Sequence, residues 1–297
     1  MSWQTRLNSS RPAVSRRAFL RKGIRLLFGT LGLGALTAGY AYGLERHWLQ
    51  VASRTVGIPG LPPEWQGVRI VHFSDLHLGH YFGINELEQV AHSIDQERPD
   101  LICFTGDLVD EGTSLLPEAV PVLRQMQAPL GKFAVLGNHD WRYGKDVIIR
   151  QAWLDAGFQV LMNENAAIAK QGSTLYIAGL DDVLYGVPDP AAALRGVPEE
   201  GKVILLVHEP DFADEAAKHP FVLQLSGHSH GGQVRLPVLG HLVVPPMGRK
   251  YVHGLHHVGD RGMPVYTSRG IGTTILPVRF FCRPEITVLT LEALTEH

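Results

Sequence analysis

Short apolar runs alternate with amphipathic segments along most of the chain. Runs that predict buried strands cover residues 68–75, 101–107, 131–136, 158–168, 174–180, 202–208, 221–226, 265–268 and 285–291. Apolar residues at helical spacing predict helices over residues 85–97, 116–127 and 145–156. Because strands alternate with helices, we expect an α/β fold in which helices cover both faces of the sheets.

The amino-terminal segment has a different pattern. No acidic residue precedes Glu45, whereas seven basic residues do, and residues 26–44 are uncharged. Signal-peptide cores usually span about 7–15 apolar residues and a membrane-spanning helix roughly 20, so this run lies near the upper limit. Residues 15–21 (SRRAFLR) resemble a twin-arginine export signal, and an ordinary stop-transfer anchor is the alternative.

These features predict three segments. Residues 1–44 form a twin-arginine signal peptide or membrane anchor, residues 45–67 a linker punctuated by Pro and Gly, and residues 68–297 the folded domain. The basic flank favours a cytoplasmic amino terminus and an extracytoplasmic body, attached to the membrane or the cell wall. Residues 39–41 (GYA) only approach an Ala-x-Ala cleavage site, so removal and retention of the segment both stay open. The expected partners include the twin-arginine translocation machinery.

Composition narrows the possible functions. Beyond the seven amino-terminal basic residues, 20 basic residues face 29 acidic ones, so we expect no nucleic acid partner. The two cysteines, Cys103 and Cys282, exclude a disulfide-stapled scaffold and a cysteine-built metal site. Fifteen histidines are many for 297 residues, and several stand beside Asp or Gly, which indicates metal chemistry.

Polar clusters follow five of the predicted strands. They are Asp75-Leu76-His77, Gly106-Asp107, Gly137-Asn138-His139-Asp140, His208, and Gly227-His228-Ser229-His230. Ligands of open α/β sheets gather beyond the carboxyl ends of strands, so these clusters should converge. Asp, Asn and His supply the oxygen and nitrogen ligands that Mn²⁺, Zn²⁺ and Fe accept. In an extended segment, residues two apart point to the same side, so His228 and His230 can face one pocket.

The order of these clusters closely resembles the calcineurin-like metallophosphoesterase superfamily over residues 68–233. The resemblance implies a four-layer α/β/β/α sandwich of two mixed sheets, with a binuclear metal site at the carboxyl ends of the strands. It implies one metal held by Asp75, His77, Asp107 and His230, and a second held by Asp107, Asn138, His208 and His228. It also makes His139 the general acid, with Asp140 orienting His139.

The resemblance implies phosphoester hydrolysis by attack of a metal-bridging hydroxide, with two divalent ions, of which Mn is expected first and Zn or Fe are alternatives. The amino-terminal signal, the block at residues 227–233 (GHSHGGQ) and residues 284–286 (PEI) are similar to the exported YkuE/YaeI-like phosphodiesterases. A phosphodiester is therefore the expected substrate. A UDP-diacylglucosamine-type pyrophosphohydrolase and a non-catalytic metal-binding scaffold are the alternatives.

Four further residues could belong to the functional site or have only a structural or surface role. His80, which follows the first cluster, is either a substrate contact or an exposed loop residue. His253 falls in a Gly-rich stretch that could border the site. Asp181 and Arg269 follow further strands, and each is either a site residue or a structural one.

Overall fold

The structure is a computed structural model that describes residues 16–294. The chain divides into two compact units, residues 1–40 and residues 41–297. The described part of the first unit is helix α1 (Arg16–Gly43), whose last turn belongs to the second unit. By length and composition, α1 could cross a membrane. Ser15 of the expected export signal lies outside the described residues, and Arg16 and Arg17 open α1.

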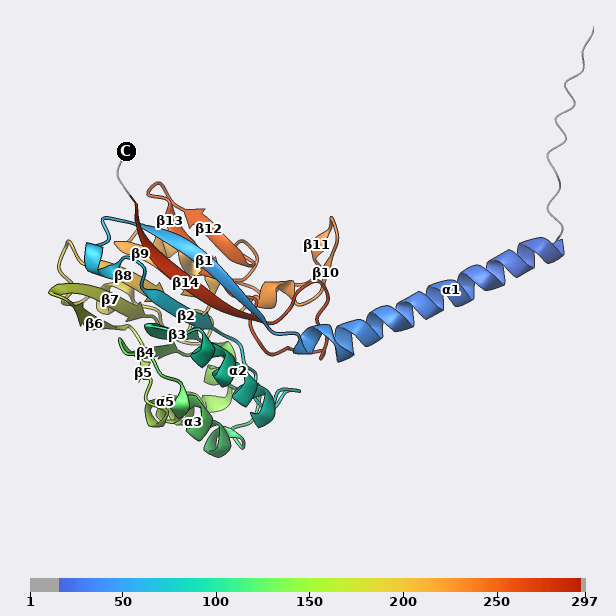
Figure 1. Cartoon of the computed structure of the whole chain (residues 1–297), viewed down its shortest axis with the longest axis horizontal. Coiled ribbons are helices and arrows are strands. Elements are labelled where there is room, and N and C mark those ends of the chain that lie inside the picture. Colours follow the sequence, from blue (N-terminus) through green and yellow to red (C-terminus); the bar gives the residue numbers. More distant parts are fainter. Residues whose placement is uncertain (1–15, 295–297) are drawn as a thin grey trace, which may run out of the picture. The chain divides into compact units, whose positions relative to one another are not determined.

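The second unit contains two six-stranded sheets (Figure 1). In the first, the order is β1 (Gln50–Pro59), β14 (Glu285–Leu294), β2 (Arg69–Phe73), β3 (Leu101–Thr105), β4 (Lys132–Val135) and β5 (Gln159–Val160). In the second it is β12 (Gly254–Val258), β13 (Met263–Thr267), β9 (Phe221–Ser226), β8 (Lys202–Leu206), β7 (Ser173–Gly179) and β6 (Glu164–Lys170). Both sheets are mixed, because β14 runs antiparallel to β2, and β12 and β6 run antiparallel to their neighbours.

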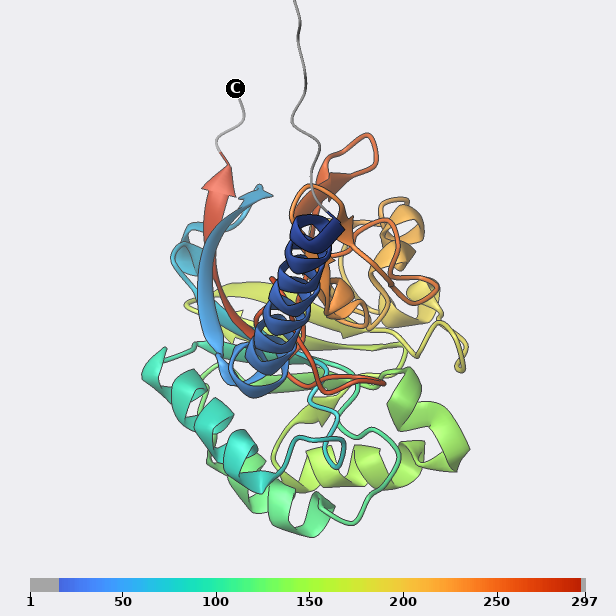
Figure 2. The same ribbon diagram turned by 90° about the vertical axis from the view of Figure 1, so that its right-hand side faces the viewer.

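The alternation of side chains along the strands builds the layers. Ile70 and Cys103 of the first sheet pack into a core shared with the second sheet, whereas Val71 and Phe104 face the opposite way. Helices α2 (Ile84–Gln96), α3 (Leu116–Gln125) and α5 (Asp146–Asp155) pack on that outer face and lie together in Figure 2. Helices α6 (Pro190–Ala193) and α7 (Ala213–Ala216) cover the second sheet. The expected α/β/β/α sandwich is confirmed.

Short elements complete the second unit. They are α4 (Asn138–Trp141), the 3₁₀ turns η1 (Glu45–His47), η2 (Pro63–Trp65), η3 (Arg142–Gly144), η4 (Pro210–Phe212) and η5 (His230–Gly232), and the hairpin β10 (Arg235–Leu236) and β11 (Gly240–His241).

Two expectations about the chain's organisation are wrong. Residues 45–67 are not a linker, because they contain β1, which pairs in parallel with β14 along its whole length. Ile58 and Trp65 from this segment are completely buried between the sheets. Residues 158–168 are not one strand, because the chain turns at Asn163, whose φ is 58°, and passes from the first sheet to the second.

Candidate metal centre

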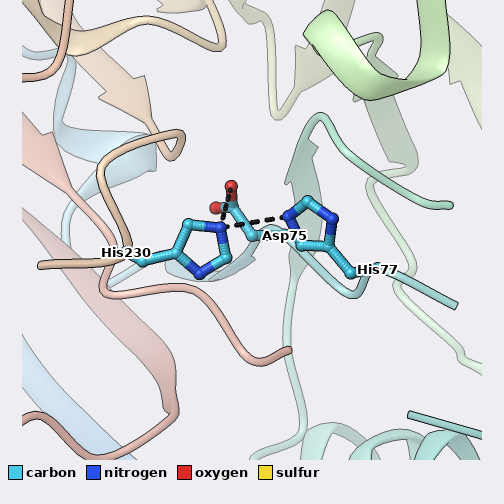
Figure 3. Close-up of side chains that lie close together, drawn as sticks. All are labelled: Asp75, His77 and His230. Carbon is cyan, nitrogen blue, oxygen red and sulfur yellow. Dashed lines mark hydrogen bonds and ion pairs between the residues drawn. The ribbon is translucent and has the colours of Figure 1, made fainter. Parts of the chain in front are cut away.

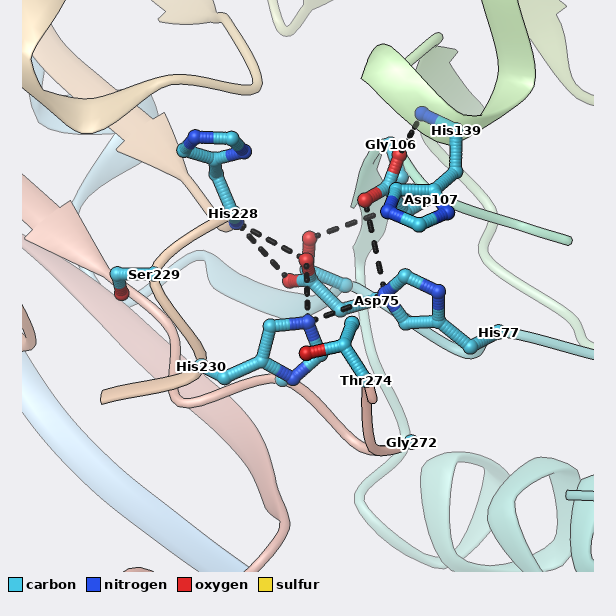
Figure 4. Close-up of polar contacts among 12 residues, drawn as sticks. Asp75, His77, Gly106, Asp107, His139, His228, Ser229, His230, Gly272 and Thr274 are labelled. Atoms are coloured by element: carbon cyan, nitrogen blue, oxygen red, sulfur yellow. Dashed lines mark hydrogen bonds and ion pairs between the residues drawn. The ribbon is translucent and has the colours of Figure 1, made fainter. Parts of the chain in front are cut away.

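The seven predicted metal ligands converge at the carboxyl ends of the strands. Figure 4 shows Asp75, His77, Asp107, His228 and His230 among them. These residues follow three strands of the first sheet and two strands of the second, and each of the seven residues is at most 5% exposed. They are Asp75 and His77 after β2, Asp107 after β3, Asn138 at the start of α4, His208 after β8, and His228 and His230 after β9. Side chains up to 155 positions apart thus share one buried pocket, as the order of the clusters predicts.

Asp75, His77 and His230 form the first group (Figure 3). Their ligand atoms all lie within 4.8 Å of one another. His77 Nε2 is 3.0 Å from His230 Nε2, and His230 Nε2 is 3.5 Å from Asp75 Oδ1. Burial, together with the charges of His77 and Arg279, holds the pKa of His230 well below its usual value. A neutral imidazole is the form that binds a metal.

Asp107 joins this group to the second one. Its Oδ2 lies 3.5 Å from His77 Nε2 and 3.2 Å from His208 Nε2. Its other oxygen, Oδ1, accepts the backbone N–H of His139 at 2.8 Å. One carboxylate oxygen therefore faces ligands of both groups, which is the arrangement of a bridging ligand.

The second group is completed by Asn138. Its Oδ1 is 3.2 Å from His208 Nε2 and 3.0 Å from His228 Nδ1. His208 Nδ1 donates to the carbonyl oxygen of Thr105 at 2.6 Å, and His228 Nε2 donates to that of Pro246 at 2.8 Å. These bonds fix the ring orientations and leave one nitrogen of each imidazole free for a cation.

The residues of the pocket fit two divalent cations. Burial and the charge of Asp107 raise the pKa of the Asp75 carboxyl. Burial and the charge of Asp107 raise the pKa of Asp140 to about 7. Cations would favour the ionised carboxylates, and the donor set of oxygen and imidazole nitrogen suits Mn²⁺, Zn²⁺ or Fe.

His139 lies at the edge of the pocket, with its side chain 14% exposed. Its Nδ1 is 3.2 Å from Asp110 Oδ1, and its ring packs edge-on against His77 at 4.7 Å between centroids. Burial alone would lower the pKa of His139, but the hydrogen bond to Asp110 and the charge of Asp107 outweigh it and raise the pKa. A partly exposed imidazole with a raised pKa beside the cluster suits a general acid.

The expected contact between Asp140 and His139 is wrong. Asp140 stands in the first turn of α4, and its carboxylate folds back onto backbone N–H groups. It accepts them from Asp107 at 2.8 Å, Leu108 at 2.9 Å and Gly137 at 3.1 Å. Asp140 therefore shapes the two loops that carry Asp107 and Asn138, and within the described part of the chain Asp110 is the carboxylate that orients His139.

The sequence reasoning missed Asp110. Its Oδ1 also accepts the Nδ1 proton of His77 at 3.0 Å, and its Oδ2 lies 3.5 Å from His80 Nδ1. Burial would raise the pKa of Asp110, but the hydrogen bonds from His139 and His77 dominate and lower it strongly. The sequence feature that could have indicated Asp110 as a site residue is its position three residues after Asp107, in the same loop.

The loops that deliver the ligands carry backbone strain. Asp75, His77, Asp107, His228 and His230 all have φ between 49° and 67°. Such conformations are costly for residues other than glycine and cluster at functional sites. They let the side chains at each strand end turn back towards one point.

The four residues with open readings take different places. The Nδ1 atom of His80 lies 3.5 Å from Asp110 Oδ2, next to the predicted metal ligands. Asp181 accepts backbone N–H groups of its own loop from Asp182 and Val187. Arg269 forms an ion pair with Glu285 at the start of β14.

His253 is the fourth of these residues. Burial, then the charges of Arg235 and Arg269, lowers its pKa to about 4.

The chain is similar to known proteins. The profile of the calcineurin-like phosphoesterase family matches residues 68–232. The metallophosphoesterase YkuE of Bacillus subtilis is 40% identical over 94% of this chain and 98% of its own length. The phosphodiesterase YaeI of Escherichia coli is 31% identical over 94% of this chain and 99% of its own. The UDP-2,3-diacylglucosamine pyrophosphatase LpxG of Chlamydia trachomatis is 29% identical over 91% and 98%.

Proposed function

The chain belongs to the calcineurin-like phosphoesterase family and is a metal-dependent phosphoester hydrolase, and we propose that it is a membrane-anchored phosphodiesterase that uses Mn²⁺ and acts outside the cytoplasm. The observation that carries the proposal is the joining of two ligand groups by Asp107 Oδ2. A phosphodiester is favoured because YaeI, named a phosphodiesterase, is similar over nearly the whole chain.

The chain's own residues have separable tasks in this reaction. When bound, two divalent cations lower the pKa of water and neutralise negative charge on a phosphoryl group. Asp107 keeps both ligand groups at a fixed separation, and the backbone N–H of His139 holds its second oxygen. Asp110 orients His77 and His139, and His139 donates a proton to the leaving oxygen.

Hydrolysis of bis-p-nitrophenyl phosphate by the purified full-length chain tests this function. We expect activity with Mn²⁺, loss after chelation and recovery when Mn²⁺ is restored. Metal analysis of the protein from its own host should find two ions per chain. Stable binding of two ions without hydrolysis at any pH would favour the non-catalytic scaffold instead.

His139→Ala tests the proton donor. The variant should keep its metal content and lose about 100-fold or more of the turnover, the usual contribution of a general acid. Because an activated leaving group needs less protonation, the loss should be smaller with p-nitrophenyl than with alkyl diesters. Loss of metal in a folded His139→Ala protein would contradict the assignment.

We propose that α1 stays attached as an anchor rather than being removed. The nearest approach to a cleavage site ends at Ala41, and the Ala41 carbonyl oxygen accepts the N–H of Arg279 at 3.1 Å. Glu45, four residues later, is 2% exposed and accepts the N–H of Cys282 at 2.6 Å. Cleavage at Ala41 would cut inside packed structure. Mass analysis of the membrane-extracted protein should find residues 16–43.

The alternative reaction is hydrolysis of a lipid-linked pyrophosphate. The similarity to LpxG supports it, because that relative is named as a pyrophosphatase of a lipid precursor. A substrate panel containing UDP-2,3-diacylglucosamine and simple diesters separates the two. A clear preference for the pyrophosphate would replace the phosphodiester proposal and leave the metal centre unchanged.

A further inference from the structure

Two loops of the second unit expose large apolar side chains. Val238 and Leu239 form the tip of the β10–β11 hairpin and are fully or largely exposed, and Val243 follows them. Ile275 is 85% exposed in the loop before β14. Clusters of exposed aliphatic residues on a soluble surface usually mark a contact with a membrane or another protein. These loops therefore have the exposed apolar side chains that are typical of such a contact.

The two loops form one surface. Arg235 donates its N–H to the Phe280 carbonyl at 2.8 Å, and Phe280 donates to the carbonyl of Gln233 at 3.0 Å. The Gln233 side chain binds the Thr274 N–H at 2.9 Å and the Leu276 carbonyl at 2.9 Å. We call the joined surface the apolar rim, whose exposed members are Val238, Leu239, Leu242, Val243, Ile275, Leu276 and Phe281.

The apolar rim is bonded to the residues that end α1. Arg279, inside the second loop, donates to Ala41 in the last helical turn, and Cys282 donates to Glu45 just beyond it. The guanidinium of Arg283 stacks on Trp48, which is half exposed, 3.6 Å from the ring centroid. Trp is enriched where proteins cross the membrane–water interface, and Arg can lay its apolar stem on such a surface while its charged end stays in water.

The apolar rim also borders the metal centre. The segment after the ligand His230 leads within five residues to β10. Gly272 donates its N–H to the carbonyl oxygen of the ligand Asp75 at 2.7 Å; both residues are labelled in Figure 4, and the exposed Ile275 lies three residues after Gly272. Arg279, which is completely buried, places its Nη2 3.4 Å from His230 Nδ1. One edge of the pocket is therefore continuous with this surface.

We propose that the apolar rim rests on the outer leaflet of the bilayer that α1 spans, and that the metal centre takes a phosphoester carried by a lipid of that leaflet. The proposal rests on the function and anchoring proposed above. A bilayer is favoured over a protein partner because a spanning α1 ends at Gly43, and Ala41 in its last turn accepts the N–H of Arg279 from the loop that carries Ile275.

Fluorescence quenching of the full-length chain in nanodiscs tests the contact. Val238→Cys and Ile275→Cys carry an environment-sensitive label, and the native Cys103 and Cys282 are buried and so protected from labelling. Val147→Cys on α5, where an apolar side chain is also mostly exposed, is the matched control. Lipids with nitroxide groups in their acyl chains should quench the first two labels at least about twofold more than the third.

The results separate the possible occupants. Equal quenching at all three sites would overturn the proposal. Labels at Val238 and Ile275 that are shielded from water but insensitive to lipid nitroxides would also overturn it, and would place a protein partner or a second copy there instead.

A second measurement tests the substrate class. Val238→Asp combined with Leu239→Asp should lower the hydrolysis of a fluorescent phosphatidylglycerol in the nanodisc by about tenfold, since the reacting group would be displaced. Hydrolysis of soluble bis-p-nitrophenyl phosphate should stay unchanged, as it should in Val147→Asp. Equal rates on the lipid would refute the lipid assignment, whereas absence of activity on both substrates in the unmodified chain would count against the proposed function itself.

Discussion

At the scale of single residues, Asp110 is not one of the predicted metal ligands, but its carboxylate orients the ligand His77 and the proton donor His139. Asp110→Asn leaves the size unchanged but gives His77 and His139 an amide instead of a carboxylate. We expect metal affinity to fall 10- to 100-fold, the usual effect of losing such an orienting carboxylate. Titration of the chelated protein with Mn²⁺ measures it. Asp214→Asn, which removes an exposed partner of Lys250, is the control and should change nothing.

A substitution at Gly137 tests how closely its loop must approach the ligands Asp107 and His208. Its φ of −114° suits any residue, so only space matters. A Cβ there would overlap the Asp107 carboxylate and lie 2.8 Å from His208. Gly137→Ala should therefore push two ligands apart and reduce turnover by about 100-fold or more. Gly112→Ala, where the new Cβ meets nothing within 4 Å, should keep the normal rate.

At the scale of elements, β1 is the first strand after α1 and belongs to the first sheet. Ile58 of β1 is completely buried between the two sheets, whereas Ser53 on the same strand is exposed. Ile58→Ala should lower the free energy of unfolding by about 2–5 kcal/mol. Ser53→Ala should change it by about 0.5 kcal/mol or less. Denaturant unfolding in detergent measures both, and equal effects would mean that β1 does not belong to the core.

Patterns in the sequence predicted most central strands, because buried strands such as β3 and β8 are uninterrupted apolar runs. β1 was missed because its exposed positions carry Ser53, Arg54 and Thr55, a polar run typical of an edge strand rather than a core one. Local pattern also cannot tell which carboxylate reaches His139. Asp140 is its neighbour in sequence, but the backbone of α4 turns the Asp140 side chain towards the β3 loop.

At the scale of the whole molecule, we expect the free energy of unfolding to fall at low pH, in part because of the buried His72, which is not a predicted metal ligand. His72 lies between the sheets, with Nε2 2.8 Å from the Thr105 hydroxyl and its ring edge-on to Tyr266. Burial lowers its pKa to about 3, whereas in the unfolded chain the pKa is near 6.5. Below pH 6.5 the unfolded chain therefore binds a proton that the folded chain excludes, so stability falls as the pH falls.

We expect His72 to contribute a loss of about 1.4 kcal/mol for each pH unit between 6.5 and 3. His72→Gln keeps a polar partner for Thr105 but cannot titrate, so its unfolding free energy should fall less steeply with acid by that amount. Comparing the two slopes under the same metal conditions cancels the protonation of the metal ligands, which both proteins share. Identical slopes would show that water or a charged partner reaches His72 in the folded protein, and that the two sheets are not sealed against each other there.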